Sequence, residues 1–171
     1  MSADVPEILD AWRMVTARRG FEGHVRMSSL ERLRDSLADA DGDVAFALDF
    51  GRDALQVAYV EVRIEAQLPL QCQRTLQRFL FPVSIVQRLG LLQESDGESA
   101  EAALPEGYEA LVVPADGELH PLDLVQDELI LAIPVVPVAP GSEVVERDWP
   151  VTADEESRAN PFSALAALKK N

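Results

Sequence analysis

Residues 118–140 read ELHPLDLVQDELILAIPVVPVAP, and this stretch organises the rest of the chain. It predicts a helix over residues 122–133, because Pro121 has the backbone angle that suits a first helical turn. Pro134 ends the helix, since proline lacks a backbone donor and disfavours the helical conformation in the residue before it. The helix presents one apolar face to a core, made of Leu122, Val125 and Leu129. The stretch therefore predicts a buried helix that leaves into a rigid, extended arm.

The length of 171 residues and the hydrophobic fraction of 47% are typical of one globular domain, which we expect over residues 1–158. No run of 18 apolar residues occurs, so no transmembrane helix is predicted. The first residues, MSADVPEILDAW, lack the pattern of a signal peptide. We therefore expect a cytoplasmic protein without a membrane partner. Cys72 is the single cysteine, which excludes an intramolecular disulfide.

The formal net charge of −15 argues against a protein that coats DNA or RNA, because such binding needs many Lys and Arg side chains. A strongly acidic protein is also suited to hold a basic partner, of which ribosomal proteins are one class.

Alternating apolar and polar residues predict several strands around the organising helix. The longest spans residues 58–70 and is followed by a hairpin tip at 72–75. The other predicted strands are 21–27, 44–50, 76–86 and 108–114. We expect an α+β fold with a single antiparallel sheet, for which a barrel-like closure is an alternative, and a few packed helices. One of these helices is predicted over residues 28–42, with Ser28 and Glu31 as a capping box.

The region from Ala66 to Gln93 contains arginines but no acidic residue. Arg74, Arg78 and Arg88, with aromatic residues nearby, are the residue types that contact phosphates and stack on bases. We take these three arginines as candidate RNA-binding residues. The alternative is a sheet whose wet face carries arginine and glutamine for solubility alone, and the sequence leaves both interpretations open.

Residues 94–128 contain eleven acidic residues and no Lys or Arg. We expect residues 94–107 to form an acidic, flexible loop, because they hold too few apolar groups to offset the entropy of ordering. The spacing of the acids matches no calcium-binding loop, and the chain lacks the motifs of nucleotide-binding and common hydrolytic enzymes. We therefore expect no metal, no cofactor and no enzymatic activity.

Residues 159–171 predict a C-terminal helix. Asn160 is a suitable cap, Pro161 suits the first turn, and Phe162 begins an apolar face.

Three segments together resemble the YceD family, the large ribosomal RNA subunit accumulation proteins. The segments are LPLQCQRTLQ (68–77), DLVQDELILAIPVVPV (123–138) and NPFSALAALKK (160–170). The resemblance implies a non-enzymatic role in 23S ribosomal RNA accumulation and large-subunit assembly, through binding of ribosomal RNA or of pre-ribosomal particles. An acidic, chaperone-like binder of a basic ribosomal protein is the alternative, and an RNA hydrolase is a third reading. The candidate partner-binding residues are Asp127, Glu128, Pro161 and Phe162.

The resemblance also bears on metal binding. Family members often carry a C-x-x-C at the hairpin, followed by a His and a Cys after the proline-rich exit. Here Thr75, Ala139 and approximately Val144 stand at three of those four positions, so no zinc site is expected. We expect packing of Cys72 against Val138 or Val144 to hold the hairpin to the arm instead.

Overall fold

The structure is a computed structural model that describes residues 5–142. Its main element is a five-stranded sheet with the strand order β2-β3-β4-β5-β6. The strands are β2 (Gly20–Arg26), β3 (Asp43–Arg52), β4 (Ala58–Gln71), β5 (Arg78–Gln93) and β6 (Tyr108–Val113). A separate two-stranded pair joins β1 (Leu9–Asp10) to β7 (Glu118–Leu119). The helices are α1 (Ala11–Ala17), α2 (Glu31–Arg34), α3 (Gly97–Ala102) and α4 (Pro121–Ala132).

The predicted α+β class is confirmed, but the sheet is mixed and not wholly antiparallel. Strands β2 to β5 pair antiparallel, whereas β6 pairs parallel to β5, with Tyr108 beside Arg88. A parallel neighbour needs a crossover connection, and residues 94–107 provide it. They contain a 3₁₀ turn over Glu94–Asp96 and the short helix α3, and Leu104 lies against the backbone of Gly90. Within residues 5–142 the sheet is open, with β2 and β6 at its two edges, and not a closed barrel.

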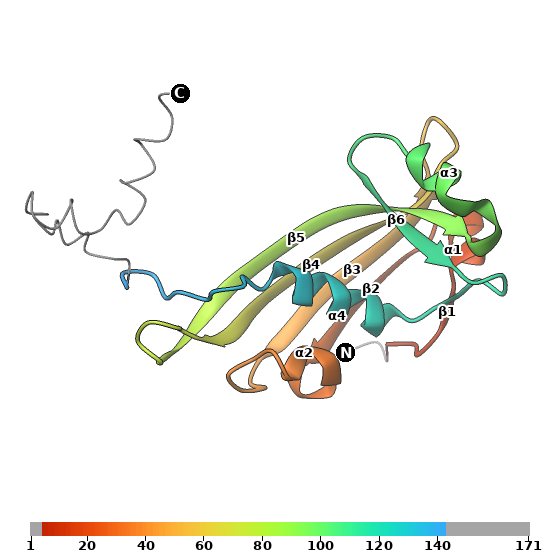
Figure 1. Cartoon of the computed structure of the whole chain (residues 1–171). Helices are drawn as coiled ribbons and strands as arrows, with labels where there is room; N and C mark the ends of the chain where they lie inside the picture. Colours follow the sequence, from red (N-terminus) through yellow and green to blue (C-terminus); the bar gives the residue numbers. More distant parts are fainter. Residues whose placement is uncertain (1–4, 143–171) are drawn as a thin grey trace, which may run out of the picture.

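One face of the sheet is covered by helices and the other is open. Figure 1 shows α4 crossing one face of the sheet with α2 beside it, and α1 near the end of the sheet opposite the β4–β5 hairpin. On β4 every second side chain from Ala58 to Leu70 is buried beneath these helices, as the alternation predicted. On β3 the buried positions are Val44, Phe46, Leu48 and Phe50. The opposite face carries the polar side chains discussed below.

The helix predicted over residues 28–42 is wrong in extent. Only one turn, Glu31–Arg34, is α-helical, and a 3₁₀ turn over Met27–Ser29 precedes it. The chain then returns to the sheet, where the N–H of Ala38 donates to the carbonyl of Pro69 at 2.8 Å. Leu30 and Leu33 of this segment are nevertheless fully buried in the core.

The organising helix is confirmed almost to the residue. Pro121 is its first residue, and Ile133 just after it is extended with ψ 124°, as a residue before proline should be. Val125 and Leu129 are fully buried against the sheet, which fixes α4 across the covered face. No helix of the described part is long and apolar enough to cross a membrane.

Candidate functional site: the hairpin tip, the arm and the open sheet face

The β4–β5 hairpin extends beyond the rest of the sheet. Strand β3 accompanies β4 only as far as the Val44–Ala66 pair, whereas β4 and β5 stay paired to Gln71 and Arg78. The turn beyond them, residues 72–77, is exposed except for Cys72. Figure 1 shows this hairpin at one end of the molecule, with the chain after α4 running beside it. The hairpin tip, defined as residues 71–78, is therefore a projecting surface.

The arm after α4 is attached to the tip by hydrogen bonds. The N–H of Gln73 donates to the carbonyl of Pro137 at 2.9 Å. The N–H of Ala139 donates to the Cys72 sulfur at 3.3 Å, and the Ser142 hydroxyl lies 3.6 Å from the same sulfur. The predicted packing of Cys72 against Val138 stays a prediction, and the structure adds a backbone donor and a hydroxyl at the sulfur. Val144, the other valine considered, lies outside the described residues.

These contacts also change the acidity of the thiol. The N–H of Ala139, followed by the hydroxyl and N–H of Thr75, lowers the pKa of Cys72 to about 6. Among residues 5–142, no three His, Cys, Asp or Glu side chains come together as a metal site would need. The groups around this sulfur are amides and hydroxyls, which suit hydrogen bonding to a thiolate.

The three candidate arginines do not form one patch. Arg78 and Arg88 are ten residues apart on β5, which corresponds to about 33 Å along an extended strand. Arg74 and Arg78 belong to the tip, where Arg74 donates to the carbonyl of Ser142 at 3.1 Å. Arg78 forms a two-pronged ion pair with Asp39, and this pairing lowers the pKa of the carboxyl. Arg74 is thus the one of the three that contacts no carboxylate among the described residues.

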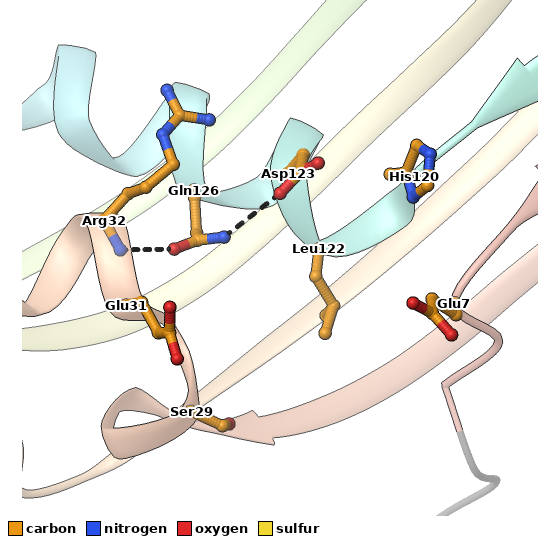
Figure 2. Close-up of a pocket in the computed structure, with 8 residues that line it drawn as sticks. All are labelled: Glu7, Ser29, Glu31, Arg32, His120, Leu122, Asp123 and Gln126. Carbon is orange, nitrogen blue, oxygen red and sulfur yellow. Dashed lines mark hydrogen bonds between the residues drawn. The ribbon is translucent and has the colours of Figure 1, made fainter.

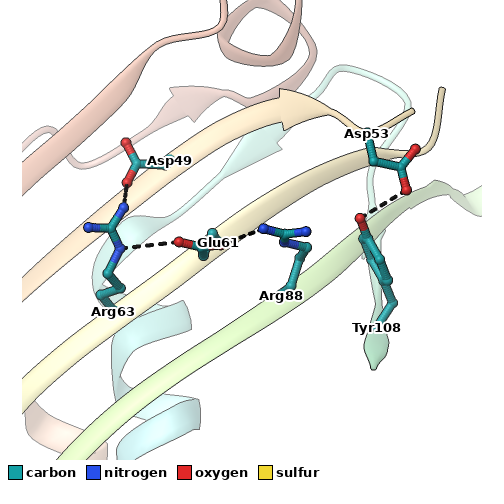
Figure 3. Close-up of polar contacts among 6 residues, drawn as sticks. All are labelled: Asp49, Asp53, Glu61, Arg63, Arg88 and Tyr108. Carbon is teal, nitrogen blue, oxygen red and sulfur yellow. Dashed lines mark hydrogen bonds and ion pairs between the residues drawn. The ribbon is translucent and has the colours of Figure 1, made fainter. Parts of the chain in front are cut away.

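Arg88 is part of a polar ladder across the open face (Figure 3). Its guanidinium donates to Glu61 at 2.7 Å and lies 4.7 Å from the ring centre of Tyr59. Arg63 continues the ladder from Glu61 to Asp49 on β3. The hydrogen bond from Arg88 is the largest cause that lowers the pKa of Glu61.

The far end of the ladder is closed by a tyrosine. The Tyr108 hydroxyl donates to Asp53 at 3.0 Å, and its ring lies 5.8 Å from the Arg88 guanidinium. Burial alone would raise the pKa of Asp53, but the N–H groups of Val57 and Leu55 and this hydroxyl lower it overall. Every charge of the ladder has a partner, which favours a cross-strand structural role for Arg88 over RNA contact. Sequence reasoning missed the ladder, because the predicted strand 76–86 ends before Arg88 and the predicted tip 72–75 is shorter than the turn that sets the Glu61–Arg88 register.

A pocket of about 320 Å³ lies between α2, the start of α4 and the N-terminal segment (Figure 2). Three carboxylates line it, from Glu7, Glu31 and Asp123. At its base the buried Gln126 accepts a hydrogen bond from the N–H of Arg32 at 3.0 Å, and it donates to Asp123 at 3.5 Å.

The predicted partner-binding residues divide into three cases. Asp127 is engaged within the fold, since it pairs with Arg32 at 2.5 Å. Glu128 has no ion pair among residues 5–142, and burial, then Glu109 and Asp127, raise its pKa. Pro161 and Phe162, with the rest of the predicted C-terminal helix, lie outside the described residues.

Comparison with known proteins decides the family. The family model described as "Large ribosomal RNA subunit accumulation protein YceD" matches residues 60–169, which is more than half of the chain. The chain belongs to the YceD family. The matched part includes the tip, α4 and the arm.

A curated relative of the same name is known from Haemophilus influenzae (strain ATCC 51907 / DSM 11121 / KW20 / Rd). It is "Large ribosomal RNA subunit accumulation protein YceD", 26% identical over 171 residues, with 97% of each chain covered. No solved structure matches this YceD-family chain significantly.

Proposed function

We propose that this protein is a non-enzymatic assembly factor that supports the accumulation of large-subunit ribosomal RNA. The observation that carries the proposal is similarity over nearly the whole length, 97% of each chain, to a relative whose name states that role. The family match over residues 60–169 supports the same conclusion. Direct contact with ribosomal RNA, or with a precursor particle, is the mechanism proposed here.

The tip is the part of the surface best suited to contact RNA. It projects beyond the sheet, and it lies in the one long stretch, Ala66 to Gln93, that has no acidic residue in a chain of net charge −15. Apart from the exposed Leu76, its exposed side chains are donors and amides: Gln71, Gln73, Arg74, Thr75, Gln77 and Arg78. Phosphate oxygens accept hydrogen bonds from such groups, and contact with arginine releases counterions.

Within the tip, Arg74 is the stronger candidate. Its guanidinium contacts a neutral carbonyl and so keeps its full charge for a phosphate. Arg78 shares its charge with Asp39, and a phosphate would have to compete with that carboxylate. We therefore place the main RNA contact at Arg74 and a weaker one at Arg78, and assign Arg88 to the ladder.

The test is binding of the full chain to large-subunit ribosomal RNA over a series of salt concentrations. Arg74→Glu should weaken binding several-fold and reduce the slope of log affinity against log salt by about 1. Arg78→Glu should have a smaller effect. The matched control is Arg13→Glu, which reverses an exposed charge on α1, at the opposite end of the molecule from the tip. Equal losses from Arg13→Glu and Arg74→Glu would show that the tip has no special part in binding.

A second function rests on the acidic side of the molecule. Residues 94–128 hold eleven acids without a Lys or Arg, and Glu128 is half-buried next to other carboxylates. A basic ribosomal protein would relieve that repulsion. The chaperone role replaces the first proposal under two conditions. Arg74→Glu and Arg78→Glu bind ribosomal RNA with the same affinity as the wild type, and a basic ribosomal protein co-purifies with the wild type but not with Glu128→Gln.

A further inference from the structure

Strand β2 is a free edge of the sheet. It is first in the strand order, and its seven residues pair only with β3 among the described residues. Figure 1 shows β2 at the margin of the sheet, beyond β3. Edge strands expose a row of backbone donors and acceptors, and proteins normally protect such edges or use them for pairing.

The hydrogen-bond pattern shows which residues of β2 face outward. Arg19 accepts from the N–H of Phe50 at 3.1 Å, and Met27 donates to the carbonyl of Gly42 at 3.0 Å. Antiparallel bonding alternates along a strand, so the odd-numbered residues between these two bond to β3. The backbone groups of the even-numbered residues therefore point away from the sheet: Gly20, Glu22, His24 and Arg26.

These outward groups are open to a partner strand. All four residues are exposed, and within residues 5–142 only the carbonyl of Arg26 is used, by the Ser29 hydroxyl at 2.7 Å. The edge carries neither proline nor lysine, two residues that commonly block edge pairing.

The sequence of the edge is complementary to itself. The midpoint of β2 is Gly23, and an antiparallel copy related by a twofold axis at Gly23 would pair all seven residues. On the open face this register puts Glu22 opposite His24 of the partner subunit, with Arg26 of the partner subunit on one diagonal and Glu22 of the partner subunit on the other. On the covered face it puts Phe21 opposite Val25 of the partner subunit, and both side chains are only partly buried in the single chain. No like charges stand opposite each other.

We propose that a second copy of this chain pairs with the β2 edge, giving a twofold dimer with one continuous ten-stranded sheet. Even-numbered residues would stand opposite even-numbered residues, so their outward N–H and C=O groups would form hydrogen-bonded pairs. The interface is isologous, as twofold dimers require. It lies on a different strand from the hairpin tip and is independent of the proposed RNA contact.

The test is the concentration dependence of mass for the full chain, measured by sedimentation equilibrium. The wild type should dimerise, and His24→Glu should weaken dimerisation at least tenfold by placing a new carboxylate opposite Glu22 of the partner subunit. Glu22→Lys should also weaken dimerisation, because it places a cation diagonal to Arg26 of the partner subunit. The double variant Glu22→Lys with His24→Glu should recover most of the loss, because opposite charges again face each other. A misfolded variant could not give that recovery. The matched control is Glu65→Lys, the same charge change on the open face of the interior strand β4, which should leave dimerisation unchanged.

A backbone variant tests the pairing itself. His24→Pro removes an N–H that points outward and makes no bond to β3, so the monomer should keep its fold while dimerisation is lost. A protein that is monomeric up to its solubility limit would overturn the proposal and leave the edge to a strand of another protein. A dimer insensitive to His24→Pro and to both charge variants would overturn it as well.

Discussion

At the scale of single residues, the neighbours of each charge determine what that charge can do. Arg74 and Arg88 look alike in the sequence, but Arg74, on the projecting tip, contacts a carbonyl, whereas Arg88 donates to Glu61 and lies against two tyrosine rings. The charge of Arg74 is available to an outside ligand, whereas the charge of Arg88 is engaged in contacts that join neighbouring strands. The same reasoning separates Asp127, which is paired with Arg32, from Glu128, which has no ion pair in the described part of the chain.

Glu128 gives a prediction with a definite sign. Burial, with Glu109 and Asp127 nearby, raises the pKa of this carboxyl above its ordinary value of 4.5, so the folded state disfavours the ionised form. That penalty is complete at neutral pH and disappears as the pH falls below the ordinary pKa. Glu128→Gln should therefore raise the free energy of unfolding at pH 7 by about 0.5 kcal/mol and give no gain near pH 4. Urea unfolding at both pH values measures this.

The neighbouring carboxylate provides the control. Asp127→Asn removes the ion pair with Arg32, whose side chains are 49% and 56% exposed, and should cost about 0.2–1 kcal/mol at pH 7. If the free energy of unfolding rises with Glu128→Gln and falls with Asp127→Asn, the result supports the assignment of Glu128 as the carboxylate without an ion pair in the described part of the chain. Destabilisation by both variants would contradict it.

The sequence identified the arginines as candidate RNA-binding residues but could not show which of them are neutralised by carboxylates. The absence of acids between Ala66 and Gln93 pointed correctly to an unusual region. The acids that neutralise Arg78 and Arg88 come from Asp39 and Glu61, outside that stretch, so a local count overstated the free charge. Pairing across strands, and not composition along the chain, decides which arginine is available.

At the scale of elements, the ends of α4 and the start of α2 show where local sequence patterns predict a helix end correctly and where they do not. Helix α4 begins at Pro121 and ends before Pro134 because backbone geometry allows little else. Helix α2 has a sequence that matches a capping box, but neither Ser28 nor Glu31 forms it. The side chain of Gln126, from α4, accepts from the N–H of Arg32 and thus caps the first turn of α2. A cap supplied from 94 residues away in the chain is invisible to a local motif.

This cap predicts unequal effects of two substitutions. Gln126→Ala should cost about 1–2 kcal/mol, because it leaves the N–H of Arg32 without its partner and removes the tie between α2 and α4. Ser28→Ala should change stability by less than about 0.5 kcal/mol. Chemical denaturation of both variants compares them directly. A larger cost for Ser28→Ala would restore the capping box and refute the role of Gln126.

The strands were easier to predict than their partners. Alternation identified β3 and β4 with their buried faces, because one face of the sheet is covered and the other is wet. The parallel pairing of β6 could not be read from its six residues, since it depends on how the 94–107 crossover returns to Gly90. The same segment was expected to be a flexible loop, and it contains α3.

At the scale of the whole molecule, the functions proposed here occupy separate regions. The hairpin tip projects from one end of the sheet, the acidic crossover 94–107 with α3 lies at the other end, and the β2 edge lies along one side. The acidic residues of α4 lie on the covered face between them. A chain of net charge −15 can therefore approach RNA through a tip whose neighbouring carboxylate, Asp39, is paired with Arg78. The attachment of the arm to the tip through Gln73, Cys72 and Arg74 links α4 to that surface.

The most direct test of the central claim is the ratio of large-subunit to small-subunit ribosomal RNA in cells. Deletion of the gene should lower this ratio, the wild-type chain should restore it, and Arg74→Glu should restore it only in part. Arg13→Glu, expressed at the same level, should restore it fully. A ratio that is unchanged by the deletion would contradict the proposal that this protein supports large-subunit ribosomal RNA accumulation.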